Sequence, residues 1–207
     1  MEKDMKHIVG IILMAGLCLG LSAISFRLGV GEDTAGETIS SIDGLMTGFK
    51  NEIAHTASFQ MEHNHKNISY GLGVDYQFPR ENRKLPDGWS SNIGKHEHIP
   101  VYGILSYDFG STNKIRPSLV AQFGYDFAHY KFTNNDEDDR YKSTDGLFYG
   151  YGISFAFDNF SLALLHRTNN STIIWEQLES GEWVKNSDFN LATRQINLSL
   201  GYRFKVH

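Results

Sequence analysis

Residues 195–204, QINLSLGYRF, decide the fold of this chain. Their apolar side chains stand at every second position, namely Ile196, Leu198, Leu200, Tyr202 and Phe204. The positions between them hold polar or small residues, namely Gln195, Asn197, Ser199, Gly201 and Arg203. Successive side chains of a β-strand point to opposite faces. The stretch therefore predicts a strand with one apolar face and one polar or small face.

Seven further segments alternate in the same way, although two are less regular. These segments are 26–31, 53–63, 70–78, 98–109, 118–127, 147–157 and 160–169. In the less regular two, the otherwise polar face also carries Tyr102, Ile104 and Leu165. The composition of 14 Phe, 10 Tyr and 20 Gly against 4 Pro favours many short strands over helices. We therefore expect an all-β chain of eight antiparallel strands.

The links between these strands alternate between short and long. The short links contain Asn, Asp or Gly, which tolerate the positive φ of hairpin turns, and they are 64–67, 110–113 and 158–159. The long links are hydrophilic, and they are 32–52, 79–97, 133–145 and 170–193. This alternation is typical of an up-and-down barrel in a bacterial outer membrane, with short periplasmic turns and four longer extracellular loops.

A soluble β-sandwich or lipocalin-type barrel is the alternative, because it also alternates along its strands. Such a protein buries its apolar face and exposes charged side chains. Here the polar face carries mostly Gly, Ser, Gln and Asn, as expected inside a narrow barrel. Aromatic residues near strand ends also fit the girdles of a membrane barrel, and they are Tyr76, Phe78, Tyr107, Phe109, Tyr125, Phe127, Tyr202 and Phe204.

Residues 1–23 have the pattern of a secretory signal peptide. Lys3 and Lys6 precede an apolar run over 8–21 that ends in small residues. The run is shorter than the roughly 20 apolar residues that a membrane-spanning helix needs. We therefore expect cleavage after residue 23 and a barrel domain over 24–207.

The charge argues against nucleic-acid binding, and the cysteine content argues against a fold held by disulfides. The net charge of −5 comes with no cluster of basic residues, so nothing indicates nucleic-acid binding. Cys18 is the one cysteine and lies in the expected signal peptide, so the mature chain cannot form a disulfide framework.

The polar face also carries isolated charges that we expect inside the barrel. They are Arg27, Glu62, Asp75, Arg116, Asp126 and Arg203. An eight-stranded barrel has room only for side chains, and a buried charge must be paired. Three acids balance three arginines, so we expect a closed polar network in a filled interior. A narrow channel through this network is the alternative.

The sequence predicts no metal site and no cofactor. His63 and His65 flank a short link, whereas His96 and His98 close a long one, so the two pairs lie at opposite barrel ends. Two histidines alone bind a metal weakly. The acidic tract 134–140 lacks the ligand spacing of a calcium loop.

Residues 166–169, His-Arg-Thr-Asn, resemble the His-x-Ser-Asn of outer-membrane lipid A deacylases. The resemblance implies His166 as a base and Thr168 as a nucleophile on the lipid-facing wall. The chain departs from that family in having Thr168 in place of serine. It also has Arg194 and Ile196 where an orienting acid is needed. A lipid A-modifying hydrolase is thus the enzymatic alternative to a non-enzymatic protein.

The whole chain resembles the OmpA/OmpX-type small outer-membrane barrels. The segments that carry the resemblance include PVYGILSY at 100–107, GLFYGYG at 146–152 and NLSLGYRF at 197–204. The resemblance implies that Tyr202 and Phe204 form a C-terminal signal for the barrel-assembly machinery. It also implies a monomer surrounded by outer-membrane lipid and lipopolysaccharide. We expect its extracellular loops to serve membrane integrity, adhesion or contact with a host surface.

Overall fold

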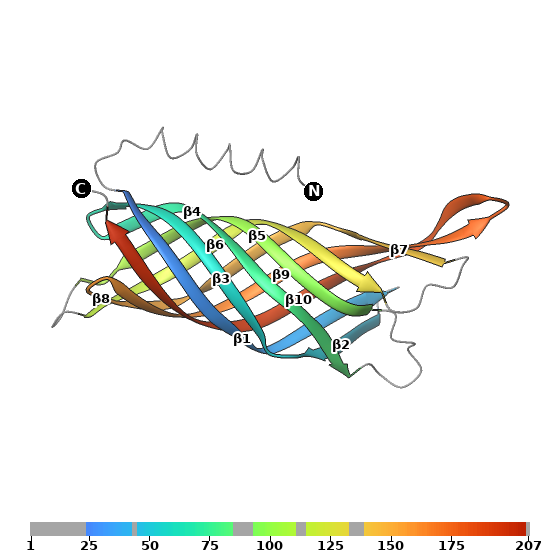
Figure 1. Ribbon diagram of the computed structural model, residues 1–207, viewed down its shortest axis with the longest axis horizontal. Coiled ribbons are helices and arrows are strands. Elements are labelled where there is room, and N and C mark those ends of the chain that lie inside the picture. Colours follow the sequence, from blue (N-terminus) through green and yellow to red (C-terminus); the bar gives the residue numbers. More distant parts are fainter. Residues whose placement is uncertain (1–23, 43–44, 85–92, 111–114, 133–138, 206–207) are drawn as a thin grey trace.

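A computed structural model describes residues 24–42, 45–84, 93–110, 115–132 and 139–205. The expected signal peptide lies outside the described residues. The strands, shown in Figure 1, are β1 (Ile24–Ile42), β2 (Leu45–Asn51), β3 (Ala54–His65), β4 (Ile68–Lys84), β5 (Ile93–Asp108), β6 (Ile115–Phe132), β7 (Asp139–Thr144), β8 (Gly146–Phe157), β9 (Phe160–Glu179) and β10 (Glu182–Lys205). Within the described residues, no helix is long and apolar enough to cross a membrane.

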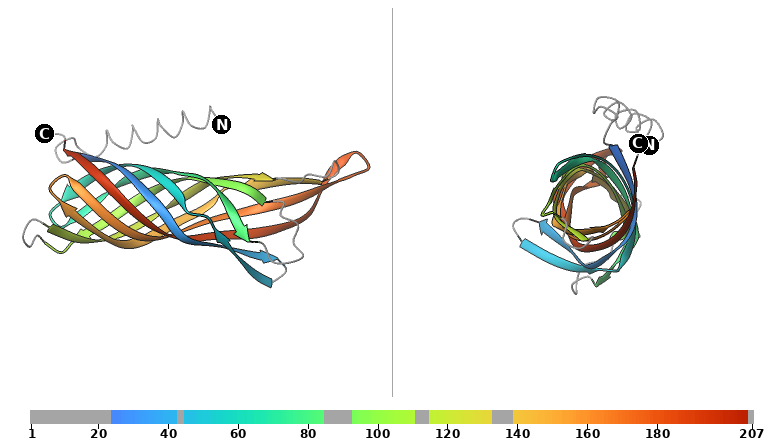
Figure 2. Two further views of the ribbon diagram at one scale, coloured as in Figure 1. Left: turned by 60° about the horizontal axis from the view of Figure 1, so that its bottom comes forward. Right: turned by 90° about the vertical axis from the view of Figure 1, so that its left-hand side faces the viewer.

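The ten strands occupy eight positions in one barrel wall, because two positions are each built from two successive strands. Glu52 and Ile53 separate β2 from β3, which both pair with β1 and β4. Asp145 separates β7 from β8, which both pair with β9. All ladders are antiparallel, and β10 pairs with β1 to close the ring seen end-on in Figure 2. The expected eight-stranded antiparallel barrel is confirmed.

The register of the ladders sets the width of the barrel. Glu32 of β1 pairs directly with His55 of β3. Following the pairs from Glu32 the other way round, through β10, β9, β8, β6, β5 and β4, leads to His65 of β3, ten residues further along that strand. With a rise of about 3.3 Å per residue and a spacing of about 4.8 Å between strands, this stagger tilts the strands by roughly 40°. The corresponding radius is about 8 Å, so side chains must fill the interior.

The wall is apolar outside and polar inside, the reverse of a soluble protein. Val30 is 66% exposed and Phe123 is 65% exposed on the outer wall, whereas Asp75 and Gln77 are fully buried inside. Lipid can cover such an outer wall, because its hydrocarbon removes apolar side chains from water. The soluble sandwich is therefore excluded, and the alternation read from residues 195–204 has the expected orientation.

The long links are shorter than the sequence indicates, because the strands continue into them. β1 extends to Ile42, and β9 and β10 continue to a tight turn at Ser180 and Gly181, which have φ of 53° and 87°. Much of 32–52 and 170–193 is therefore sheet. The outer wall is apolar only along the part of the barrel that faces lipid, and we call this part the apolar band. Beyond it, toward the β9–β10 turn, both strand faces meet water. The sequence there carries no apolar alternation, although the backbone still pairs.

Two of the short links are the expected hairpin turns. His65 pairs with Ile68 across a two-residue turn, in which Lys66 has a φ of 54°. Phe157 pairs with Phe160 across a second one, in which Asp158 has a φ of 52°. The third link, at 110–113, lies largely outside the described residues. These turns stand at the barrel end opposite the projecting β9–β10 hairpin (Figure 1).

Candidate functional site

The interior of the barrel is the first candidate site, and apolar side chains cross its middle. Tyr102, Ile104, Val120, Phe148 and Leu165 pack together there, with Ala163 against them. We call this cluster the central apolar layer. The side chains that interrupt the polar faces of two strands in the sequence therefore have a structural role. They separate a polar cluster at the turn end of the barrel from one at the hairpin end.

At the turn end, Glu62 lies between two arginines. Its carboxylate is 3.2 Å from the Arg27 guanidinium and 3.1 Å from that of Arg203. Three of the six charges predicted for the interior therefore meet in one group. Arg116 is half-buried at the same end, and it pairs with no acid among the residues that the structure describes. An internal cavity of about 20 Å³ is lined by Arg27, by Ile104, Val120 and Leu165 of the central apolar layer, and by Arg167, and it has room for about one water molecule.

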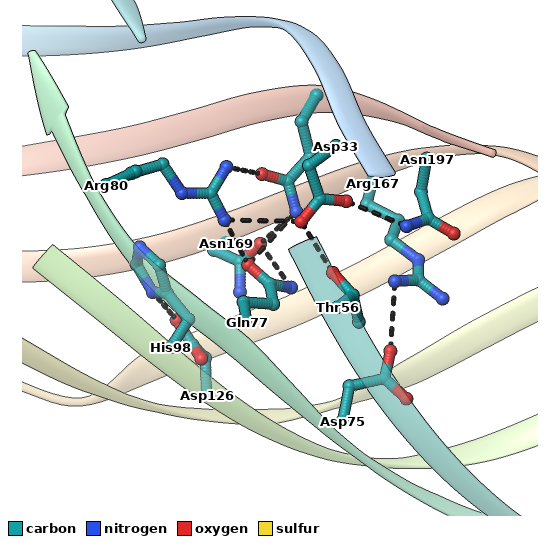
Figure 3. Close-up of polar contacts among 11 residues, drawn as sticks. Asp33, Thr56, Asp75, Gln77, Arg80, His98, Asp126, Arg167, Asn169 and Asn197 are labelled. Atoms are coloured by element: carbon teal, nitrogen blue, oxygen red, sulfur yellow. Dashed lines mark hydrogen bonds and ion pairs between the residues drawn. The ribbon is translucent and has the colours of Figure 1, made fainter. Parts of the chain in front are cut away.

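At the hairpin end, Asp33 and Arg80 organise a second network, drawn in Figure 3. Asp33 accepts hydrogen bonds from Thr56 at 2.7 Å and Asn197 at 2.8 Å, and its carboxylate is 3.4 Å from Arg80. Arg80 also donates to Gln77 at 2.8 Å and to Gln195 at 2.5 Å. All these side chains are buried. This group was not predicted, because Asp33 and Arg80 fall in segments where the sequence predicts extracellular loops.

The remaining predicted acids have partners outside the set of six charges predicted for the interior. Asp75 forms an ion pair with Arg167 at 2.9 Å and accepts a hydrogen bond from Tyr102 at 2.6 Å. Asp126 lies 2.6 Å from Nδ1 of His98. Alternation would have identified Arg167, because a lipid-facing His166 and Thr168 require the residue between them to face inward.

A second apolar cluster lies above these polar groups. It consists of Ala128, Tyr130, Ile173 and Leu191, with Tyr141 packed against it. The Tyr130 hydroxyl is 2.9 Å from that of Ser171, and its ring stacks on His96 at 5.5 Å.

His96 and His98 both point inward, but the described residues contain no group of three or more potential ligands arranged to hold a metal ion. Most of the acidic tract 134–140 lies outside the described residues.

His166 and Thr168 lie on the outer wall of β9, as alternation requires. The His166 ring stacks on Tyr151 at 5.1 Å, and no hydrogen bond joins it to Thr168. Among the described residues, no carboxylate pairs with His166. The arrangement therefore lacks the contacts of a catalytic triad.

Tyr202 and Phe204 lie on the outer wall near the turn end. The Tyr202 ring meets Phe204 at 4.8 Å and Phe160 at 5.1 Å, in edge-on contacts typical of an aromatic girdle. Their recognition by the assembly machinery stays a prediction.

The projecting sheet is the second candidate site. It consists of β7 and the upper parts of β9 and β10, which continue beyond the barrel (Figure 1). Arg140 and Lys142 of β7 both bind the carboxylate of Glu176 in β9, Lys142 at 2.8 Å. Arg140 also lies 4.5 Å above the ring of Trp183 in β10. These contacts join all three strands on one face.

Acidification is expected to loosen β7 from β9. Hydrogen bonds from Lys142 and Arg140 lower the pKa of Glu176 below its ordinary value of 4.5. The ion pairs are therefore complete above pH 4.5 and are lost as the pH falls through the lowered pKa. Acrylamide quenching of tryptophan fluorescence should increase over that acidic range in the intact chain. Glu176→Gln should remove this step, and identical pH profiles for the two proteins would contradict the assignment.

The fold is found among solved structures, whereas sequence comparisons find no relative. No family model and no curated protein matches this chain. The outer membrane protein OprG from Pseudomonas aeruginosa is 14% identical, with a TM-score of 0.58, over 88% of this chain and 96% of that one. The outer membrane protein AlkL in lipid bilayers is 13% identical, with a TM-score of 0.54, over 89% of this chain and 90% of that one. These likenesses concern the fold.

Proposed function

We propose that this chain, a small β-barrel of the bacterial outer membrane, is a non-enzymatic surface protein that binds through its projecting sheet. The observation that carries the proposal is the contrast between its two candidate sites. The interior is crossed by the central apolar layer and filled by buried ion pairs. The sheet of β7, β9 and β10 instead presents charged and aromatic side chains to the exterior.

The filled interior supports a structural role over that of a channel. Phe148 is completely buried within the central apolar layer, and Tyr102 is 1% exposed. Hydrated ions do not enter an apolar constriction readily, because they would lose water without gaining polar partners. The polar clusters on each side are then a means of pairing charges inside a narrow barrel.

The projecting sheet supports a binding role because its strands hold one another in place. The Tyr141 ring stacks on Trp175 at 6.4 Å, and Arg140 connects Glu176 with Trp183. Trp183 remains 38% exposed. Ordered aromatic and arginine side chains lose little freedom when they bind a partner, and they are frequent at the centres of interfaces. Adhesion to a host or neighbouring surface is the activity that fits this position best.

The contacts of His166 favour a non-enzymatic protein over a lipid A hydrolase. Thr168 would need His166 as its base, and His166 would need an acid to orient it. The stacking of His166 on Tyr151 supplies neither contact. An unchanged lipid A acyl pattern in cells that express the protein agrees with the proposal, whereas deacylation that depends on His166 would overturn it.

Shortening the projecting sheet is expected to reduce adhesion several-fold. The variant replaces residues 176–186 with an Asn-Gly turn that joins Trp175 to Ser187, which are paired neighbours. It retains Ile173 and Leu191, which pack inside the barrel. Adhesion of bacteria that display each protein would be counted on epithelial monolayers.

The control for this experiment is folding of the shortened barrel, measured as heat-modifiable migration on unboiled gels. Arg116→Gln supplies a matched variant, since it removes a charge at the opposite barrel end. Equal adhesion by the shortened and intact proteins would contradict the proposed function.

A further inference from the structure

A polar patch interrupts the apolar outer wall where β8, β9 and β10 reach its upper edge. Direct pairing places Arg194 of β10 beside Thr168 of β9, and Thr168 beside Tyr149 of β8. Two residues lower on the same strands, His166 pairs with Ile196 and with Tyr151. On β9 and β10 the exposed apolar residues of the barrel wall end just below the patch, at Leu164 and Ile196, as expected where lipid headgroups meet the barrel.

Thr168 carries a polar atom that has no partner. Its side chain points outward, yet it is only 1% exposed, between the longer side chains of Tyr149 and Arg194. Its hydroxyl makes no hydrogen bond, and neither does the buried Nδ1 atom of His166. A buried polar atom without a partner costs about 1–3 kcal/mol, so two of them, two residues apart on the same face of β9, indicate a place for a polar ligand.

Arg194 supplies a positive charge beside these atoms. It is exposed, its ladder partner on the side away from Thr168 is Glu37 of β1, and it forms no ion pair with the side chains that the structure describes. A lipid-facing arginine is tolerated near the membrane interface, where its head can leave the hydrocarbon. Its planar guanidinium binds phosphate through two parallel hydrogen bonds, a geometry that lysine cannot offer.

We propose that Arg194, Thr168 and His166 bind a phosphate group of lipopolysaccharide in the outer leaflet. Arg194 pairs with the phosphate, and Thr168 and His166 complete its hydrogen bonds. The acyl chains then lie along the apolar wall below, over Ile196 and Leu164, which are 41% and 46% exposed. No covalent step is involved.

This site goes beyond the surface-binding function and lies on a different part of the molecule. It uses the wall of the barrel, whereas adhesion uses the sheet above it. It also gives a non-catalytic role to the residues that resemble a deacylase motif. A lipid fixed at β8–β10 would anchor the base of the projecting sheet, since β9 and β10 belong to both.

The test is native mass spectrometry of the full chain in detergent micelles with added lipid A. The expected result is one retained lipid A molecule, with apparent affinity reduced about tenfold or more by Arg194→Gln, as for loss of a charged hydrogen-bonded pair. Thr168→Val keeps the shape of the side chain and should weaken binding several-fold. Lipid A without its phosphates should bind the intact chain as weakly as lipid A binds R194Q.

Lys131→Gln is the matched control, because Lys131 is exposed on the outer face of β6, three strands from β10, which carries Arg194. It should leave the affinity unchanged. Heat-modifiable migration would verify that every variant is folded. Equal weakening by K131Q and R194Q would show diffuse charge attraction and overturn the site. Equal binding of phosphorylated and dephosphorylated lipid A, or displacement by inorganic phosphate at similar concentrations, would also overturn it.

Discussion

Arg167→Met is expected to destabilise the folded barrel by about 3–5 kcal/mol, the usual loss when one partner of a buried ion pair is removed. Asp75 is completely buried, and Arg167 is 2% exposed. Without Arg167, the Asp75 carboxylate keeps the hydrogen bond from Tyr102 but loses its compensating charge. The change would be measured as a lower urea midpoint for unfolding from lipid vesicles, followed by tryptophan fluorescence.

Two controls separate charge compensation from loss of packing. Asp75→Asn combined with Arg167→Met removes both charges and should recover much of the lost stability. Arg203→Met leaves Glu62 with Arg27 as a second partner, so it should cost clearly less. If R203M cost as much as R167M, or if the double variant were no better than R167M, the ion pair would not be the cause.

Phe148→Ala is expected to cost about 3–5 kcal/mol and to make the barrel conduct ions. Phe148 is completely buried, and its ring lies 5.1 Å from that of Tyr102 in the central apolar layer. Removing the ring leaves a space between the polar cluster at the hairpin end and the 20 Å³ cavity below. Planar-bilayer recordings should show discrete steps for F148A and none for the intact chain.

Phe155→Ala is the control for this variant, because Phe155 lies on the outer wall of the same strand and is 39% exposed. It removes an identical side chain without opening the interior, so it should not conduct. Steps of equal size in the intact chain would contradict the role of the central apolar layer and favour the channel. A silent F148A that is otherwise folded would show that further layers close the barrel.

The bulge in β4 shows why part of the interior could not be predicted. Gln77 pairs with His98, but Arg80 pairs with His96, so β4 has one extra residue between the two pairs. Pro79 lies in this bulge and cannot donate a ladder hydrogen bond. The extra residue turns Arg80 inward, although simple alternation from Gln77 places it outside. A bulge is a property of paired strands, so alternation along one strand does not reveal it.

The extent of the sheet was also only partly predictable. Period-2 alternation marks the strands where one face meets lipid and the other meets the interior. It ends at the upper edge of the apolar band, whereas pairing continues to Glu179 and Glu182. The sequence therefore predicts loops where the projecting sheet lies, and the contact between Arg140 and Glu176 does not follow from the sequence.

Residues 195–204 illustrate what the sequence determined by itself. Alternate apolar residues predict a strand with two unlike faces, and eight such strands joined alternately by short and long links predict a closed barrel with its apolar face in lipid. The partners inside were decided only by the tertiary structure. Asp75 and Arg167 come from β4 and β9, which are not neighbours in the wall, and they meet across the interior. The stagger of ten residues and the β4 bulge set which inward side chains share a level, and both arise only when all eight strand positions pair.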